Sequence, residues 1–240
     1  MEVIAGTPLS YEGTRRIEAI VTRDDRIPCD IALLGMGAEP NVGLAHGAGV
    51  ALGATGAIAT DDEMRTNLPD VYAAGDCAEV LHLVTGEPDY IPLGSTANKQ
   101  GRVAGTNAAG GKETFGGVVG TMVVRVFELA VARTGLTVDQ ARAAGHPVRA
   151  TMITGNAIAG YFPNAADLHV KLVTDDRSGR LLGGQIVGHR GVVKRIDVLA
   201  TALQCRLTVD ELRRLDLSYA PPFAPVWDPI LVAANVAVRA

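Results

Sequence analysis

The chain has 240 residues, a formal net charge of −4, an apolar fraction of 48% and an aromatic fraction of 4%. That length can bury one or two hydrophobic cores, and no apolar run is long enough to span a bilayer. A slightly acidic balance without basic clusters argues against nucleic acid or an anionic membrane as a partner.

The N-terminus has no basic stretch followed by an apolar one, so no signal peptide is evident and we expect a cytoplasmic protein. The three cysteines, Cys29, Cys77 and Cys205, are far apart, and no C-x-x-C pair or His spacing indicates a metal site. We expect Cys29 and Cys205 to be buried small apolar residues. We expect Cys77 to be structural, because the preceding carboxylate disfavours a nucleophilic thiolate.

The first residues predict two strands, Arg16–Thr22 and Ile27–Leu34, joined by a polar turn. The second strand leads into Gly35–Asn41, which has the pattern G-x-G-x-x-P. Proline takes the place of the third glycine, so the stretch fails the dinucleotide-binding fingerprint. No G-x-G-x-x-G occurs anywhere in the sequence.

A short strand is predicted over Ala54–Asp61, and a buried one over Val71–Ala74. Gly75 follows, where a missing side chain lets another group approach the backbone. Asp76 then presents a carboxylate at a strand's C-terminal end, where open α/β sheets bind ligands. An ionised Asp only accepts hydrogen bonds, which suits the hydroxyls of a polyol or sugar. A turn-capping Asp is the structural alternative.

After a loop over Leu81–Tyr90, a helix is predicted to about Ala109, with Ser95 and Thr96 as N-cap candidates. Small residues recur on one face of it, at Ala97, Gly101, Ala104 or Gly105, and Ala108. Such a face permits close packing on a sheet or a flat ring, and the helix N-terminus suits an anionic ligand edge. The alternative is a helix that simply packs tightly.

Beyond Phe115 the pattern is that of a separate α+β module. Lys194–Arg195 and His169 are expected on solvated faces. The predicted elements are a strand at 121–131, a capping box at Thr137, a hairpin over 168–187, a helix over 193–203 and a second capping box at Thr208.

Residues 72–80 (YAAGDCAEV) followed by 92–102 (PLGSTANKQGR) resemble the second FAD-binding segment of the pyridine nucleotide-disulfide oxidoreductases. Residues 181–188, 194–203 and 215–230 resemble the interface domain of the same family. The likeness is greatest to the branch of coenzyme A-disulfide reductases, NADH oxidases and persulfide reductases. It implies a partial, Rossmann-like FAD/NAD(P)-binding α/β domain followed by an α+β dimerisation domain with an antiparallel sheet.

The resemblance also implies roles for individual residues. Asp76, after Gly75, would bind the ribityl chain of FAD, and the turn Ser95, Thr96, Ala97 and Asn98 would face the pyrimidine side of the flavin. Tyr161 and Tyr219 match tyrosines that lie near the reactive cysteine of the other subunit. A phenol there can donate a hydrogen bond to a thiolate or protonate a leaving thiol. Without the resemblance, both tyrosines would be assigned to packing.

The implied organisation is the tail of an NAD(P)H-binding domain over 1–41, the returning half of an FAD-binding domain over 42–115 and an interface domain over 116–240. The phosphate loops and the redox-active cysteine of the family would lie upstream, either in the same protein or in a separately encoded N-terminal half. We expect a homodimer of an FAD- and NAD(P)H-dependent oxidoreductase acting on coenzyme A disulfide, a related disulfide or persulfide, oxygen or peroxide. The alternative is a non-catalytic dimerisation module that cannot bind FAD or turn over alone.

Overall fold

A computed structural model describes residues 4–239. The chain divides into two compact units, and the boundary in the sequence lies between Glu39 and Pro40. The first unit is a small antiparallel sheet of three strands in the order β1-β2-β3, with bounds Ser10–Glu12, Ala19–Val21 and Arg26–Pro28. Thr22 Oγ1 accepts a hydrogen bond from Asp25 N at 3.0 Å, which closes the β2–β3 turn. The two strands predicted here exist but are shorter, and β1 was not predicted.

The strand predicted over Ile27–Leu34 ends at Pro28, and this part of the prediction is wrong. Cys29 N still donates to the Glu18 carbonyl at 3.1 Å, but residues 30–41 make no backbone hydrogen bond among the described residues, and Ile31, Leu33 and Leu34 are exposed to 85%, 95% and 64%. An extended segment is stable as a strand only when its N–H and C=O groups find a neighbouring strand. The apolar pattern was identified correctly, but beyond β3 the described residues offer no further strand for it to pair with.

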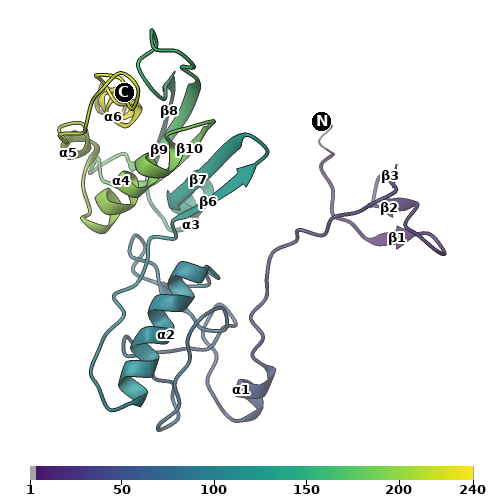
Figure 1. Cartoon of the computed structure of the whole chain (residues 1–240). Helices are drawn as coiled ribbons and strands as arrows, with labels where there is room; N and C mark the ends of the chain where they lie inside the picture. Colours follow the sequence, from purple (N-terminus) through teal and green to yellow (C-terminus); the bar gives the residue numbers. More distant parts are fainter. Residues whose placement is uncertain (1–3, 240) are drawn as a thin grey trace. The chain divides into compact units, whose positions relative to one another are not determined.

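The second unit begins with a loop-rich region around one long helix, α2 (Figure 1). Its regular elements are α1 (Gly43–Gly47), β4 (Val80–Leu81), β5 (Pro88–Asp89) and α2 (Gly94–Ala108). The stretch Leu81–Tyr90, predicted as a loop, therefore contains part of the β4–β5 hairpin.

The strands predicted over Ala54–Asp61 and Val71–Ala74 form only isolated bridges, so both predictions are wrong as strands. Ile58 pairs with Leu52 and Ala78, and Tyr72 pairs with Arg65. Val71, expected to be buried, is 37% exposed. As with the first unit, the apolar run is present but the described chain offers no ladder of partners, so it stays a loop.

The rest of the second unit is an α+β module built on a five-stranded antiparallel sheet in the order β6-β7-β10-β9-β8 (Figure 1). This arrangement confirms the predicted fold class. The module consists of β6 (Met122–Val126), β7 (Leu129–Gly135), α3 (Val138–Ala143), β8 (Val148–Asn156), β9 (Asp167–Asp175), β10 (Leu181–Gly188), α4 (Val192–Gln204), α5 (Val209–Leu212) and α6 (Pro229–Arg239).

The core of the module lies between the sheet and two helices, with α4 packed on β7 and β10 and α6 packed on β8 and β9. Leu172, Ile186, Leu199 and Ile230 are fully buried in it. The apolar positions of α4 recur at helical spacing, and that is why this helix was predictable from sequence. Burial of this kind stabilises the fold by about 1.5–3 kcal/mol per large side chain.

In this module the predictions that rest on short sequence motifs are confirmed. Both capping boxes are present, with the side chains of Thr137 and Thr208 accepting hydrogen bonds from Gln140 N and Glu211 N. The single strand predicted over residues 121–131 is instead the β6–β7 hairpin, because Phe127 adopts a left-handed backbone (φ 52°) and reverses the chain.

The cysteines differ from expectation. Cys205 is exposed rather than buried, because it lies just past the end of α4, and Cys29 is only half-buried. Cys77 is half-buried, and its Sγ donates to the carbonyl of Ala74 at 3.5 Å.

Candidate functional site

The structure brings the Asp76 turn and the start of α2 together. Gly75 has φ 88°, a conformation that glycine adopts without strain. Its N–H donates to Oε1 of Gln100 at 3.0 Å, and the Gln100 Nε2 donates to the Glu79 carbonyl at 3.1 Å. A Cβ at Gly75 would lie 3.6 Å from the Cβ of Ala97. The fully buried Gln100 amide thus ties both ends of the turn to the helix.

Asp76 itself lies at the surface of this turn. Its backbone carbonyl accepts a hydrogen bond from Tyr90 Oη at 3.0 Å. Its carboxylate accepts none from the residues that the structure describes, so it does not cap the turn. The carboxylate is therefore free to accept hydrogen bonds from a bound hydroxyl compound.

Helix α2 begins two or three residues earlier than predicted, because Leu93 is the N-cap and Ser95 and Thr96 already lie in the first turn. The two residues therefore are not N-caps. No side chain caps this end, and within residues 4–239 the N–H groups of Gly94, Ser95 and Thr96 have no acceptor. Ser95 and Asn98 are exposed and Ala97 is half-buried, whereas the Thr96 side chain is 5% exposed and points into the core. A ligand could use only the backbone of Thr96.

The stripe of small residues lies on the open side of α2. The helix buries Thr96, Gln100, Val103 and Asn107 against its own unit. Gly101 and Gly105 are exposed, and a Cβ at either would meet nothing within 4 Å. Within the described chain the expected close approach is seen at Ala97, against Gly75, whereas Gly101 and Gly105 leave a smooth, open face.

Tyr161 and Tyr219 are brought together although they come from different loops, one between β8 and β9 and one before α6. They are 77% and 48% exposed. The neighbouring phenol of Tyr161, with desolvation as a smaller cause, raises the pKa of Tyr219. Below them, Ala159 N donates to the carbonyl of Pro221 at 3.1 Å and joins the two loops.

Beside these loops lies a hollow of about 480 Å³ with a cationic wall. His189, Arg190 and Lys194 contribute to its lining, together with Ile158 and Phe223. Ile158 precedes Tyr161 by three residues, and Phe223 follows Tyr219 by four. The wall suits a ligand that carries negative charge.

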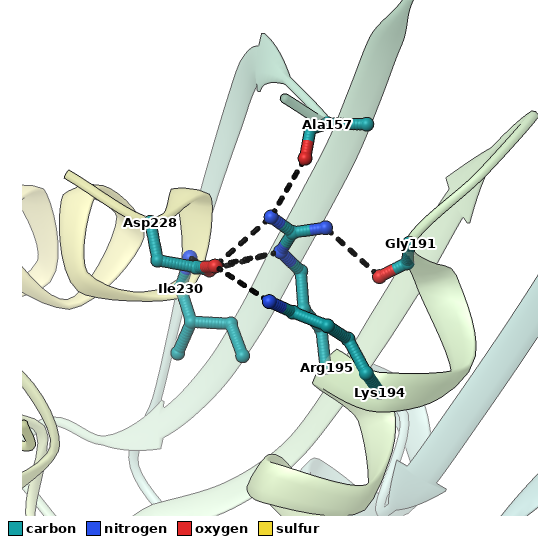
Figure 2. A network of polar contacts seen from close by, with 6 residues as sticks. All are labelled: Ala157, Gly191, Lys194, Arg195, Asp228 and Ile230. Carbon is teal, nitrogen blue, oxygen red and sulfur yellow. Dashed lines mark hydrogen bonds and ion pairs between the residues drawn. The ribbon is translucent and has the colours of Figure 1, made fainter. Parts of the chain in front are cut away.

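Lys194 and Arg195 do not both lie on a solvated helix face, contrary to the sequence prediction. Lys194 is partly exposed, but Arg195 is fully buried and faces the equally buried Asp228 (Figure 2). Its Nε donates to Asp228 Oδ1 at 2.9 Å and its Nη2 lies 2.9 Å from Oδ2. The prediction failed because the partner lies 33 residues further along the chain.

Two residues of this region were missed from sequence, Gln100 and Asp228. Gln100 is a polar residue of α2, and polar residues of this helix were expected to contact solvent or a ligand. No neighbouring residue in the sequence indicates that Gln100 is buried. Asp228 precedes a proline that opens α6, and a carboxylate before Pro at a helix start was an available signal.

Two family models match the chain. One, described as "Pyridine nucleotide-disulphide oxidoreductase", covers residues 3–101. The other, the "Pyridine nucleotide-disulphide oxidoreductase, dimerisation domain", covers residues 121–229. Together they take in most of the sequence, and the chain belongs to the pyridine nucleotide-disulfide oxidoreductase family.

Within that family the resemblance predicted from the motifs is confirmed. The "NAD(P)H sulfur oxidoreductase (CoA-dependent)" of Pyrococcus furiosus is 42% identical over 95% of this chain and 51% of the relative. An "NADH oxidase" of Methanocaldococcus jannaschii is 32% identical over 100% of this chain and 53% of the relative. The structure of an NAD-dependent persulfide reductase from A. fulgidus matches with a TM-score of 0.92 at 39% identity, over 98% of this chain and 44% of that one. The chain spans about half the length of the curated relatives it matches.

Within residues 4–239 no helix has the length and apolar character that a membrane crossing requires. No three or more His, Cys, Asp or Glu side chains in that range are grouped so that they could hold a metal ion.

Proposed function

We propose that this chain supplies the second half of the flavin site and the dimerisation domain of an FAD- and NAD(P)H-dependent oxidoreductase. In this proposal residues 1–41 end an NAD(P)H-binding domain, 42–115 complete an FAD-binding domain and 116–240 form the interface domain. The observation that carries it is the Gly75–Gln100 hydrogen bond, since it joins the two segments assigned to the flavin independently of the family motifs.

The residues present fit a flavin. Asp76 would accept hydrogen bonds from the ribityl hydroxyls, with Gly75 keeping the turn close to α2. The free N–H groups at Ser95 and Thr96, flanked by Ala97 and Asn98, would receive the electron-rich pyrimidine edge. The open small-residue face of α2 supports this, because a flat ring system can lie close to a helix that lacks large side chains. The flavin, when bound, supplies the hydride and electron transfer.

Tyr161 and Tyr219 would act on the thiol side of the reaction. A phenol can donate a hydrogen bond to a thiolate, or give its proton to the sulfur that leaves when a disulfide is cleaved. Tyr219 is protonated near neutral pH, because its pKa is raised above an ordinary value that is already 10.0, and it can donate a hydrogen bond there. We propose that the pair serves the reactive cysteine of the other protomer.

The electron acceptor we favour is an anionic disulfide or persulfide of the coenzyme A type. The cationic hollow beside the tyrosine loops supports this class, because phosphate groups pair with His, Arg and Lys side chains. Oxygen or peroxide is the second candidate, supported by the relative named NADH oxidase. The three free cysteines agree with a reducing compartment, and we assign the protein to the cytoplasm on that ground.

Tyr219→Phe tests this function in a chimera that joins the N-terminal half of the P. furiosus relative to this chain. Rapid mixing separates reduction of the flavin by NAD(P)H from reduction of a coenzyme A disulfide. We expect the second step to slow by about 10²–10⁴-fold and the first to stay nearly unchanged. Tyr11→Phe, in the other unit, is the matched control. Equal slowing of both steps would contradict the role of Tyr219, and a colourless, flavin-free chimera would favour the non-catalytic dimerisation module.

A further inference from the structure

Arg195 uses nearly every donor that it has. Besides Asp228, its Nη1 donates to the carbonyl of Gly191 and its Nη2 to the carbonyl of Ala157, each at 2.9 Å (Figure 2). Asp228 Oδ1 in turn accepts from the N–H of Ile230 at 3.1 Å. A planar guanidinium that makes several charge-assisted hydrogen bonds fixes the relative position of all its partners.

These partners come from three separate elements, two of which are the segments that carry the tyrosines. Ala157 begins the loop that carries Tyr161, Gly191 is the N-cap of α4, and Asp228 ends the segment that follows Tyr219. Gly191 is also shaped for this contact, because its φ is 71° and an added Cβ would collide with Nη1 of Arg195.

The ion pair is not needed for stability in the way that an apolar contact would be. A buried Arg–Asp pair gains little over apolar residues of similar volume, because desolvation of both charges offsets their attraction. What such a pair does provide is a defined geometry. Here the ion pair fixes the positions of both loops. The loops are also joined to each other by the hydrogen bond from Ala159 N to the Pro221 carbonyl.

We propose that Arg195 and Asp228 are positioning residues for the Tyr161–Tyr219 pair, holding the two loops so that their phenols meet. The proposal rests on the function assigned above to the tyrosines, but the geometry it predicts is measurable in the 240-residue chain without any turnover. Neither residue touches the substrate, and both act through the loops.

The experiment uses the chain labelled with ¹³Cζ-tyrosine, in which NMR follows the titration of each of the five tyrosines. Tyr161→Phe and Tyr219→Phe assign the two resonances. The pKa of Tyr219 in Tyr161→Phe then gives the value expected when the phenols no longer meet. In the double variant Arg195→Met/Asp228→Leu, which leaves no unpaired buried charge, we expect the Tyr219 pKa to fall to that benchmark.

Arg149→Met/Asp176→Leu is the matched control, because it removes another Arg–Asp ion pair of the same module, one that is half-exposed. We expect the control to keep the wild-type pKa of Tyr219. Far-UV dichroism establishes that each variant is folded at the temperature used. If the double variant does not fold, the Tyr219 pKa is measured in Arg195→Lys instead, since a compact ammonium cannot reach three acceptors that are spread around a planar guanidinium.

An unchanged Tyr219 pKa in a folded Arg195 variant would overturn the proposal, and so would an equal fall in the control. In the chimera, the double variant should slow reduction of the disulfide by up to about 10²-fold while reduction of the flavin is preserved. If Tyr219→Phe leaves that step unaffected, the proposed function fails, whereas the NMR result still decides whether Arg195 and Asp228 position the loops.

Discussion

Two charged residues of this chain, Arg195 and Asp76, differ in whether the fold supplies hydrogen-bond partners for their charge. Arg195 is satisfied inside the fold by a carboxylate and two backbone carbonyls, so its position is dictated by the structure. Asp76 projects from a fixed turn, and its carboxylate receives no hydrogen bond from the described residues. A rigid backbone that presents an unused acceptor is typical of a binding site, because the site is preorganised before the ligand arrives.

Replacing Asp76 should therefore affect flavin binding more than folding. In the chimera with the P. furiosus N-terminal half, we expect Asp76→Ala to weaken flavin binding by about 10- to 100-fold, the equivalent of a charged hydrogen bond worth roughly 1.5–3 kcal/mol. The melting temperature of the isolated chain should hardly change. Flavin content and melting are measured on the same preparations, with Asp70→Ala in the preceding turn as the control. Full flavin occupancy in Asp76→Ala would show that Asp76 is only a residue of the turn and does not bind the flavin.

His82 makes stability depend on pH. It is buried beside the β4–β5 hairpin, and desolvation lowers its pKa below the ordinary value of 6.5. The unfolded chain then binds a proton more readily than the folded one, so stability is complete above pH 6.5 and falls as the pH drops toward the lower folded pKa.

His82→Asn should remove this loss, since Asn can still accept the hydrogen bond that Val84 N donates to His82 Nδ1. Urea unfolding at several pH values between 5 and 8 measures the effect. His169→Asn is the control, because His169 is exposed. A pH dependence identical in His82→Asn and the unmodified chain would show that another group is responsible.

At the scale of elements, sequence predicted what is encoded locally. The capping boxes at Thr137 and Thr208 are four-residue signals that need no distant partner, and both are formed. Helix α4 was predictable because its apolar face repeats every three to four residues. The strand predicted over Ile27–Leu34 pairs only at Ile27 and Pro28, and Val71–Ala74 forms only the Tyr72–Arg65 bridge, because a longer strand needs a neighbour and the described chain supplies no further one.

The candidate site shows the same division. Its loops and the start of α2 could be located from Gly75, Asp76 and the small-residue stripe, but their contact depends on Gln100. Likewise Tyr161 and Tyr219 could be named from sequence, whereas the Arg195–Asp228 pair between their loops could not. Long-range polar partners leave no periodic signal in the chain.

The open face of α2 allows a prediction in which stability and binding change in opposite directions. Gly101→Leu should stabilise the isolated chain by about 0.5–1 kcal/mol, because leucine is a better helix former and nothing lies within 4 Å. In the chimera the same substitution should lower flavin content, because the added side chain occupies the smooth face.

Arg102→Leu is the matched control, since Arg102 is an exposed neighbour outside the stripe and arginine and leucine have similar helix propensities. Thermal unfolding of the isolated chain and flavin absorbance of the chimera are compared for both variants. Equal flavin content in the two would mean that the small-residue face binds nothing in the complete enzyme.

At the scale of the whole molecule, the module beyond Phe115 carries large exposed apolar side chains, including Phe223, Val226 and Trp227 at 72%, 67% and 60%. A match to the family's dimerisation domain and such a surface together lead us to expect a homodimer that buries on the order of 2,000 Å² or more. Trp227 is the only tryptophan, so its emission maximum should move to shorter wavelength as the concentration rises.

Sedimentation equilibrium at micromolar concentration checks this expectation directly. Val226→Asp should shift the chain toward monomer, because a carboxylate buried in an apolar interface is costly. Leu44→Asp, which changes an exposed apolar residue outside the dimerisation module, should leave the dimer intact. A folded monomer in the unmodified protein would refute the expected dimer.

Without a partner half, the 240 residues should be unable to oxidise NAD(P)H. No G-x-G-x-x-G is present in the sequence, so neither the flavin pyrophosphate nor the nicotinamide cofactor would have the helix N-terminus that offsets phosphate charge. Dimerisation cannot supply one, because both copies have the same sequence. We expect the chain alone to leave NAD(P)H unoxidised, and addition of the P. furiosus N-terminal half with FAD to restore oxidation. Absorbance at the nicotinamide band is followed before and after that addition, with FAD alone as the control. Steady turnover by the chain with FAD alone would mean that the phosphates are bound by a part of this chain other than a glycine-rich loop.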